Sequence, residues 1–214
     1  GIEPIGVPRA LAGTAIPFSY GDLDMIGRLF GEHQGKVAAI MMEPARSEQP
    51  EPGYLEGVKE LAHRHGALLI FDEVSCGWRE SLGGMQKVFG VTPDMTVIAK
   101  GMSNGYPMGA VVGSREAMEE GRIMFVSSSY WSDNVGLAAS LATIRELKRR
   151  DSEAVLKEMG QKTAKIIDEA VASSGLAGSC EGFPTTPGLV FNLPDGADGP
   201  KVQTLFIQEM AKRG

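Results

Sequence analysis

Two patterns of apolar residues alternate along the chain. Short, nearly continuous apolar runs are typical of strands buried in a sheet, and they occur in "KVAAIMM", "ALLIF", "MTVIA" and "GAVVG". Between these runs, apolar residues recur three and four positions apart, which predicts amphipathic helices. The predicted helices cover residues 19–35, 54–66 and 135–151. This alternation predicts an α/β fold in which a parallel or mixed sheet is covered by helices on both faces.

Two of the predicted helices carry recognisable end signals. Asp22 stands where an N-cap is expected, directly before the apolar face that begins at Leu23. Gly35 is expected to end this helix, and Gly66 is expected to cap the C-terminal end of the next. These signals fix where the helices begin and end relative to the strands.

Polar residues stand at the ends of three predicted strands. Glu43 ends the first, Asp72 and Glu73 end the second, and Lys100 ends the third. In parallel α/β sheets ligands bind at the carboxyl ends of the strands. Because adjacent carboxylates at the end of a buried strand are costly to desolvate, they need a charge partner. We therefore expect the acidic residues and the lysine to meet at one edge of the sheet.

The order of predicted helices and strands changes after about residue 150. An amphipathic helix is predicted over 153–175, a strand over 189–193 and a further helix over 201–213. The segment 179–188 is rich in Gly, Pro and Thr and is expected to be a loop. The sequence predicts two parts, with residues 1–150 in a larger α/β domain and residues 151–214 at the start of a smaller α+β domain.

Composition excludes several classes of protein. The formal net charge of −6 argues against a nucleic-acid-binding surface. The apolar runs are far too short to span a bilayer, no signal peptide is recognisable, and two cysteines suit free thiols in a reducing compartment. We therefore expect a cytoplasmic protein with neither a membrane nor a nucleic acid as partner. Because the chain opens on "GIEPIGVPRA" without an initiator Met, we expect it to be a fragment.

No metal site is expected. His63 and His65 are two positions apart in a predicted helix, and side chains at that spacing do not share a helix face. Both histidines are interpreted as solvated cations at the C-terminal end of that helix.

Asp72 and Lys100 together are the chemically informative pair. A buried aspartate can hold a cationic heterocycle, and a desolvated lysine can form a Schiff base. Pyridoxal phosphate (PLP) needs both, a carboxylate for its ring nitrogen and a lysine for its aldehyde. The alternative is a structural salt bridge between the two residues, and the strand pattern alone leaves both interpretations open.

Several segments resemble class III aminotransferases, which are PLP-dependent enzymes of fold type I. The resemblance is carried by "GYLEGVKELAHRHGALLI", then "FDEV", then "TPDMTVIAKGMSNGYPMGAVVG", with Lys100 following Asp72 by 28 positions. It is strongest from Lys36 to Leu147, and its nearest branch is the glutamate-1-semialdehyde aminomutase-like one. It implies that a large PLP-binding domain precedes the small domain, and that the N-terminal half of the family is missing from this chain.

The resemblance implies a role for each residue at the sheet edge. Lys100 matches the Schiff-base lysine, and Asp72 matches the aspartate that pairs with the pyridine nitrogen. Val74 matches the residue that packs on one face of the cofactor ring, while also being an ordinary strand valine. Glu73 matches a supporting residue, and Glu43 matches a glutamate on the substrate side, for which a capping or salt-bridge role is an equal alternative.

Hydroxyl residues complete the implied cofactor site. Ser129, with Ser128 beside it, matches the segment that binds the cofactor phosphate, where the family commonly has Thr. A serine-rich loop that caps the helix beginning near Asn134 is the alternative. Ser75 stands where many members have a Gln that contacts the cofactor phenolic oxygen, so Ser75 is a weaker candidate.

The reaction implied by the resemblance is amino-group transfer between a small-molecule amino donor and an oxo acceptor. The alternatives are an intramolecular aminomutase, which is an isomerase, and a truncated homologue without catalytic activity. The family also implies a homodimer with shared active sites.

Overall fold

The computed structural model of the chain describes residues 5–45, 48–127 and 133–214. The chain divides into two compact units, Gly1–Arg150 and Asp151–Gly214.

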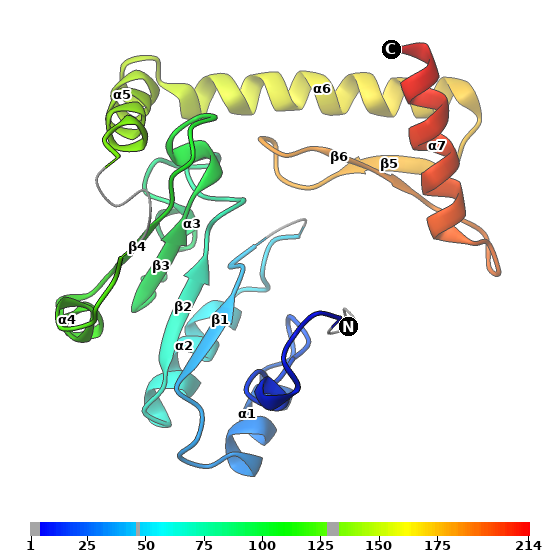
Figure 1. The fold of residues 1–214 in the computed structure, drawn as a ribbon. Coiled ribbons are helices and arrows are strands. Elements are labelled where there is room, and N and C mark those ends of the chain that lie inside the picture. Colours follow the sequence, from blue (N-terminus) through cyan, green and yellow to red (C-terminus); the bar gives the residue numbers. More distant parts are fainter. Residues whose placement is uncertain (1–4, 46–47, 128–132) are drawn as a thin grey trace. The chain divides into compact units, whose positions relative to one another are not determined.

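A four-stranded sheet forms the centre of the first unit (Figure 1). Its strands are β1 (Ala39–Met42), β2 (Leu68–Asp72), β3 (Met95–Ile98) and β4 (Ala110–Gly113), paired in that order. The first three strands are parallel, and β4 runs antiparallel to β3. The prediction of a mostly parallel sheet is confirmed.

Helices α1 (Leu23–Glu32) and α2 (Tyr54–Arg64) supply the core on one face of the sheet. On that face, alternate strand residues are buried because successive side chains point to opposite sides of a strand. The buried cluster comprises Ile26, Phe30, Ile40, Met42, Tyr54, Leu55, Val58, Ala62, Ala67, Leu69, Phe71 and Val91. On the opposite face Met41 is exposed and Ile70 is half-buried.

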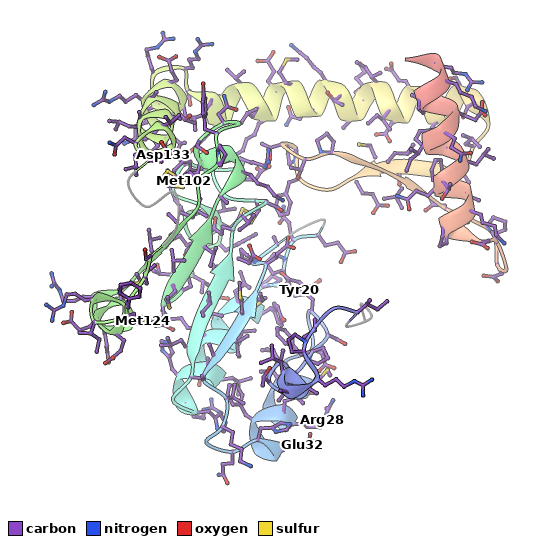
Figure 2. The ribbon with its side chains drawn as sticks, in the orientation of Figure 1. Tyr20, Arg28, Glu32, Met102, Met124 and Asp133 are labelled. Carbon is purple, nitrogen blue, oxygen red and sulfur yellow. The ribbon has the colours of Figure 1, made fainter. Side chains whose placement is uncertain are left out.

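Most of the predicted helix ends agree with those in the structure. The Asp22 side chain accepts a hydrogen bond from the Met25 N–H at 2.7 Å, which confirms it as the N-cap of α1. Arg28 and Glu32 lie on α1, and Tyr20 lies in the segment before it (Figure 2). Helix α1 ends at Glu32 with His33 as its C-cap, before the predicted end at Gly35.

The C-terminal end of α2 forms a Schellman motif. Gly66 has a φ of 71°, its N–H donates to the His63 carbonyl, and the Ala67 N–H donates to the Ala62 carbonyl. Both histidines lie at the C-terminal end of α2 and His63 is exposed, as expected, but each ring also has a partner. The His65 ring stacks on Phe30 with 4.5 Å between ring centroids, and His63 Nε2 lies 2.9 Å from Asp94 Oδ2.

Asp94 ties β2 to β3 and β4. Its Oδ2 accepts from the Leu69 N–H at 2.7 Å, its own N–H donates to the Leu69 carbonyl at 2.9 Å, and its carbonyl accepts from the Ser114 N–H. Burial favours a higher pKa for this carboxyl, but the hydrogen bonds from Leu69 and His63 outweigh it and lower the pKa.

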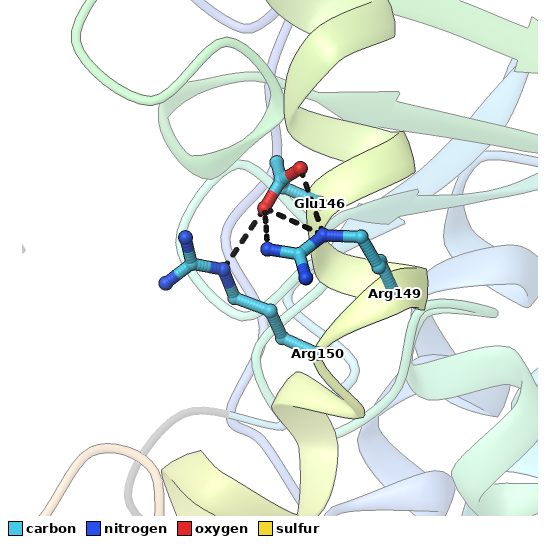
Figure 3. A network of polar contacts seen from close by, with 3 residues as sticks. All are labelled: Glu146, Arg149 and Arg150. Carbon is cyan, nitrogen blue, oxygen red and sulfur yellow. Dashed lines mark hydrogen bonds and ion pairs between the residues drawn. The ribbon is translucent and has the colours of Figure 1, made fainter.

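Short helices and one long helix complete the first unit. They are α3 (Met85–Phe89), α4 (Arg115–Glu119), α5 (Val135–Arg149) and the 3-10 helices Arg9–Leu11, Lys100–Met102 and Glu120–Arg122. Helix α5 lies against the loop that follows Lys100, because a Cβ on Gly136 would stand 2.9 Å from the Pro107 carbonyl oxygen. At its other end Glu146 binds Arg149 and Arg150, whose hydrogen bonds lower the pKa of Glu146 to about 2 (Figure 3).

The second unit combines two helices with a hairpin. Its elements are α6 (Ser152–Ser174), β5 (Gly178–Glu181), β6 (Gly188–Phe191) and α7 (Gly199–Arg213). Strands β5 and β6 pair in antiparallel fashion. The predicted loop over residues 179–188 was therefore wrong for residues 179–181, which belong to β5. The sequence "GSCE" has no apolar alternation, and its strand conformation follows from pairing with β6 and from the Cys180 N–H bond to Asp168 at 2.7 Å.

Across the described ranges, none of the helices combines the length and apolar character needed to cross a bilayer.

Replacing Asp94 by Ala should lower the free energy of unfolding by about 1–3 kcal/mol, because the part-buried Leu69 N–H loses its acceptor. Since the pKa of Asp94 is lowered on folding, its stabilising contribution is present above the ordinary value of 3.8 and is lost as the pH falls through the lower folded value. Urea unfolding at several pH values measures both effects. The exposed Asp24→Ala variant is the control, and equal losses in the two variants would contradict the role of Asp94.

Replacing Gly160 by Ala should disrupt the packing of α6 against the loop after β5. A Cβ on Gly160 would stand 1.4 Å from the Pro184 carbonyl oxygen, so the helix and the loop would have to separate. Helical Gly27 has open space around it, so Gly27→Ala should instead stabilise by up to about 1 kcal/mol. Hydrogen exchange of the residue 178–191 amides measures the effect. Unchanged protection in Gly160→Ala would show that the contact is not tight.

Candidate active site

The parallel strands bring three predicted site residues to one edge of the sheet. Asp72 is the last residue of β2 and is level with Val97 of β3, three residues before Lys100. Glu43 directly follows β1, whose Met42 is level with Phe71. All three residues therefore lie at the carboxyl edge, where α/β sheets bind ligands.

The Lys100 amine is held by a serine. Its Nζ donates to Ser75 Oγ at 2.7 Å, and the lysine side chain is exposed. Among the ion pairs formed by the described residues, none joins Lys100 to Asp72. The structural salt bridge that the sequence left open is therefore not the arrangement in this structure.

Asp72 is half-buried and uses one carboxylate oxygen locally. Its Oδ1 accepts from the Val74 N–H at 3.0 Å, which tightens the turn after β2. Within the part of the chain that is described, Oδ2 makes no hydrogen bond. Val74 is half-buried on the same turn.

Three non-glycine residues near this edge have left-handed backbone conformations. Their φ values are 63° for Trp78, 45° for Lys100 and 48° for Asn104. Such conformations cost of order 1 kcal/mol or more each and are concentrated at functional sites. Two of them lie in the segment that begins at Lys100 itself.

Glu73 points into the protein. It is 1% exposed, and its Oε2 accepts from the Met85 N–H at 2.8 Å, at the start of α3. A Cβ on Gly84 would stand 2.5 Å from this oxygen, and Gly84 has a φ of 72°, so glycine is required there. Burial raises the pKa of Glu73, against the lowering effect of the Met85 and Gln86 N–H groups. These contacts give Glu73 a packing role under the site.

The Cys76 thiol lies among the carboxylates of this edge. Burial raises its pKa to about 12, helped by the negative charges of Glu73, Glu43 and Asp72. The thiol therefore stays protonated at neutral pH and is not a nucleophile.

Lys100 and Glu43 line different hollows. The Lys100 hollow has a volume of about 540 Å³ and is lined by Arg79, Lys100, Gly101, Asn104, Gly105, Tyr106, Pro107 and Met108. The Glu43 hollow has a volume of about 560 Å³ and includes Phe18, Tyr20, Met41 and Glu48. Burial raises the pKa of Tyr20 to about 12, and its hydroxyl donates to the Pro44 carbonyl at 2.7 Å. Glu43 and Lys100 therefore lie at the same edge of the sheet, and each lines one of these two hollows.

Sequence reasoning missed Arg79. It lies in the turn after β2, and its Nε donates to the Ser75 carbonyl at 2.5 Å. The signal available was a cation seven residues after Asp72 in a turn that already carried two candidates. Ser128 and Ser129, the predicted phosphate ligands, lie outside the described residues.

The donor set at this edge fits PLP. A ring nitrogen needs a carboxylate with a free acceptor, which Asp72 Oδ2 offers, and an aldehyde needs an amine outside an ion pair, which Lys100 offers. The half-buried Val74 supplies an apolar side chain in the turn directly after Asp72.

Comparisons with known proteins identify the family. The family model for class-III aminotransferases matches residues 22–174. The chain belongs to this family, whose members are PLP-dependent, and the predicted family is confirmed.

Two curated relatives illustrate the range of the family. The chain is 34% identical to a 3-aminobutyryl-CoA aminotransferase of Cloacimonas acidaminovorans (strain Evry), over 97% of this chain and 52% of that protein. It is 35% identical to a glutamate-1-semialdehyde 2,1-aminomutase of Ignicoccus hospitalis, over 98% of this chain and 52% of that protein. The chain thus spans about half the length of the curated relatives it matches.

Solved structures agree on the fold. An omega-transaminase from Sphaerobacter thermophilus is 30% identical with a TM-score of 0.76, covering 88% of this chain and 45% of that one. A Sphingopyxis sp. MTA144 protein, solved in its PLP internal aldimine form, is 26% identical with a TM-score of 0.76, covering 86% and 45%. The predicted fold-type I class is confirmed.

Replacing Glu73 by Gln should flatten the pH dependence of stability. Because burial raises the pKa of Glu73 on folding, its contribution is most favourable below the ordinary value of 4.5 and is lost as the pH rises through the folded value. A glutamine side chain cannot titrate. The difference in the free energy of unfolding between wild type and variant should therefore change with pH above 4.5. Chemical unfolding across this range measures it, with exposed Glu56→Gln as control. A pH-independent difference would contradict the raised pKa.

Proposed function

We propose that the protein is a PLP-dependent aminotransferase in which Lys100 forms the Schiff base. The observation that carries this proposal is that Asp72 ends β2 and Lys100 follows the end of the neighbouring parallel strand β3, with the Lys100 amine bound to Ser75 and not paired with the Asp72 carboxylate. An amino donor and an oxo acceptor are its proposed substrates. Family membership supports the same reaction class.

When bound, PLP supplies an electron sink for negative charge developing on the substrate α-carbon. Asp72 keeps the proton on the ring nitrogen, which maintains the positive charge that makes the sink effective. Val74 would offer its apolar side chain to one face of the ring. Lys100 Nζ would take the proton from the substrate α-carbon as general base and then, as general acid, give it to the cofactor carbon that carried the aldehyde.

The remaining proposed roles concern assembly. We assign Ser128 and Ser129 to the cofactor phosphate, Glu43 to the substrate side and Glu73 to support of the turn that carries Val74. Residues 1–150 are proposed as part of the PLP-binding large domain, and residues 151–214 as the beginning of the small domain. We further propose a cytoplasmic homodimer with shared active sites and no membrane or nucleic-acid partner.

A second candidate is an intramolecular aminomutase of the glutamate-1-semialdehyde type. It is favoured by the 35% identity to an aminomutase and needs the same Asp72 and Lys100. The two functions differ in their substrates. An aminotransferase requires a separate oxo acceptor for turnover, whereas an aminomutase converts one substrate without it.

The first test is the absorbance spectrum of the protein with added PLP. A band near the visible edge should appear in wild type and be lost in Lys100→Ala, and borohydride reduction should fix the cofactor on Lys100 in a peptide map. Lys36→Ala, another exposed lysine, is the control and should keep the band. An amino donor should then bleach the wild-type band. Surface lysines also react with aldehydes, so a band that survives in Lys100→Ala would come from another lysine. Such a band would refute the assignment of the Schiff base to Lys100.

A further inference from the structure

Two cationic side chains line the hollow beside Lys100. Among the described residues that line it, those other than Arg79 and Lys100 are neutral and none carries a carboxylate. Like charges held on one surface repel each other unless an anion lies between them. The hollow is therefore electrostatically suited to an anionic group.

Ser75 holds both cations in place. Its carbonyl accepts from Arg79 Nε at 2.5 Å, and its hydroxyl accepts from Lys100 Nζ at 2.7 Å. The Arg79 bond is to a backbone oxygen, so it fixes the guanidinium without neutralising it. The two terminal nitrogens of the guanidinium make no hydrogen bond to the described residues.

Arg79 differs from most other arginines of the structure. Arg64, Arg122, Arg149, Arg150 and Arg213 each form an ion pair with a glutamate three or four residues earlier in the chain. Arg79 is half-buried and forms no ion pair within the described residues. A part-desolvated guanidinium without a counter-charge is the arrangement that binds carboxylates, because its planar fork matches two oxygens.

We propose that Arg79 binds the carboxylate of the amino substrate, so that the preferred donor is an amino acid and not a simple amine. This inference rests on the proposed function, since it assumes that Lys100 holds the cofactor and that the substrate amine takes the place of the lysine. The carboxylate would lie in the 540 Å³ hollow, with its amine towards the cofactor. Arg79 is thereby assigned as a specificity-determining residue.

The test compares two donors in wild type, Arg79→Leu and Arg79→Lys. The donors are 3-amino-3-phenylpropanoate and 1-phenylethylamine, which differ by the carboxylate-bearing arm. In Arg79→Leu the ratio of kcat/KM for the amino acid to kcat/KM for the amine should fall roughly 10- to 100-fold, the effect of one charge-assisted hydrogen-bonded pair. Arg79→Lys should recover part of the ratio, since it keeps the charge and loses the fork.

A binding measurement separates recognition from folding. Butanoate and butanamide are titrated against the Lys100-dependent absorbance band of each variant, and butanoate should bind more weakly in Arg79→Leu while butanamide is unaffected. Arg28→Gln removes an exposed arginine of α1 and serves as the matched control (Figure 2). PLP affinity is measured in the same titrations.

Each alternative outcome overturns the inference. If Arg79→Leu lowers kcat/KM equally for both donors and also weakens PLP binding, Arg79 would bind the cofactor phosphate. If it lowers kcat/KM equally for both donors and leaves PLP binding unchanged, Arg79 would act only by holding Ser75. An unchanged ratio would remove Arg79 from recognition. A wild-type protein without a Lys100-dependent band would instead refute the proposed function, and this inference with it.

Discussion

The hydrogen bonds between Asp94 and Leu69 fix the register of β2 against β3. Asp94 accepts from the Leu69 N–H and donates to its carbonyl just before β3 begins, so the two strands leave this point in step. Because the pairing is parallel, the same register places Asp72 level with Val97 at the other end of the strands. The approach of Lys100 to the turn after Asp72 therefore depends on a contact made at the opposite edge of the sheet.

The turn after β2 is supported from below by a buried carboxylate. Glu73 accepts from the Met85 N–H, and Gly84 leaves the room that this carboxylate needs. Burying such a group is unfavourable, and the N–H groups at the start of α3 offset part of the cost. The turn that carries Ser75 and Arg79 is therefore anchored to the start of α3 through the Glu73 side chain.

Sequence patterns predicted the sheet, the start of α1, and the meeting of Asp72 with Lys100 at one edge. These features follow from local periodicity and from the rule that parallel strands end together. Strand β5 was missed because its conformation depends on pairing with β6. The contact of His63 with Asp94 was missed because the two residues are 31 positions apart. Arg79 was missed because a side chain's partners cannot be read from its position in a turn.

The reactivity of the Cys76 thiol is lowered by its burial beside the carboxylates of this edge. With a pKa of about 12, its thiolate fraction at pH 7 is on the order of 10⁻⁵. Alkylating reagents and peroxides react with the thiolate, so this cysteine is protected even though it is only half-buried. Burial, reinforced by the negative charge of the neighbouring carboxylates, therefore keeps this thiol in its less reactive protonated form beside the site.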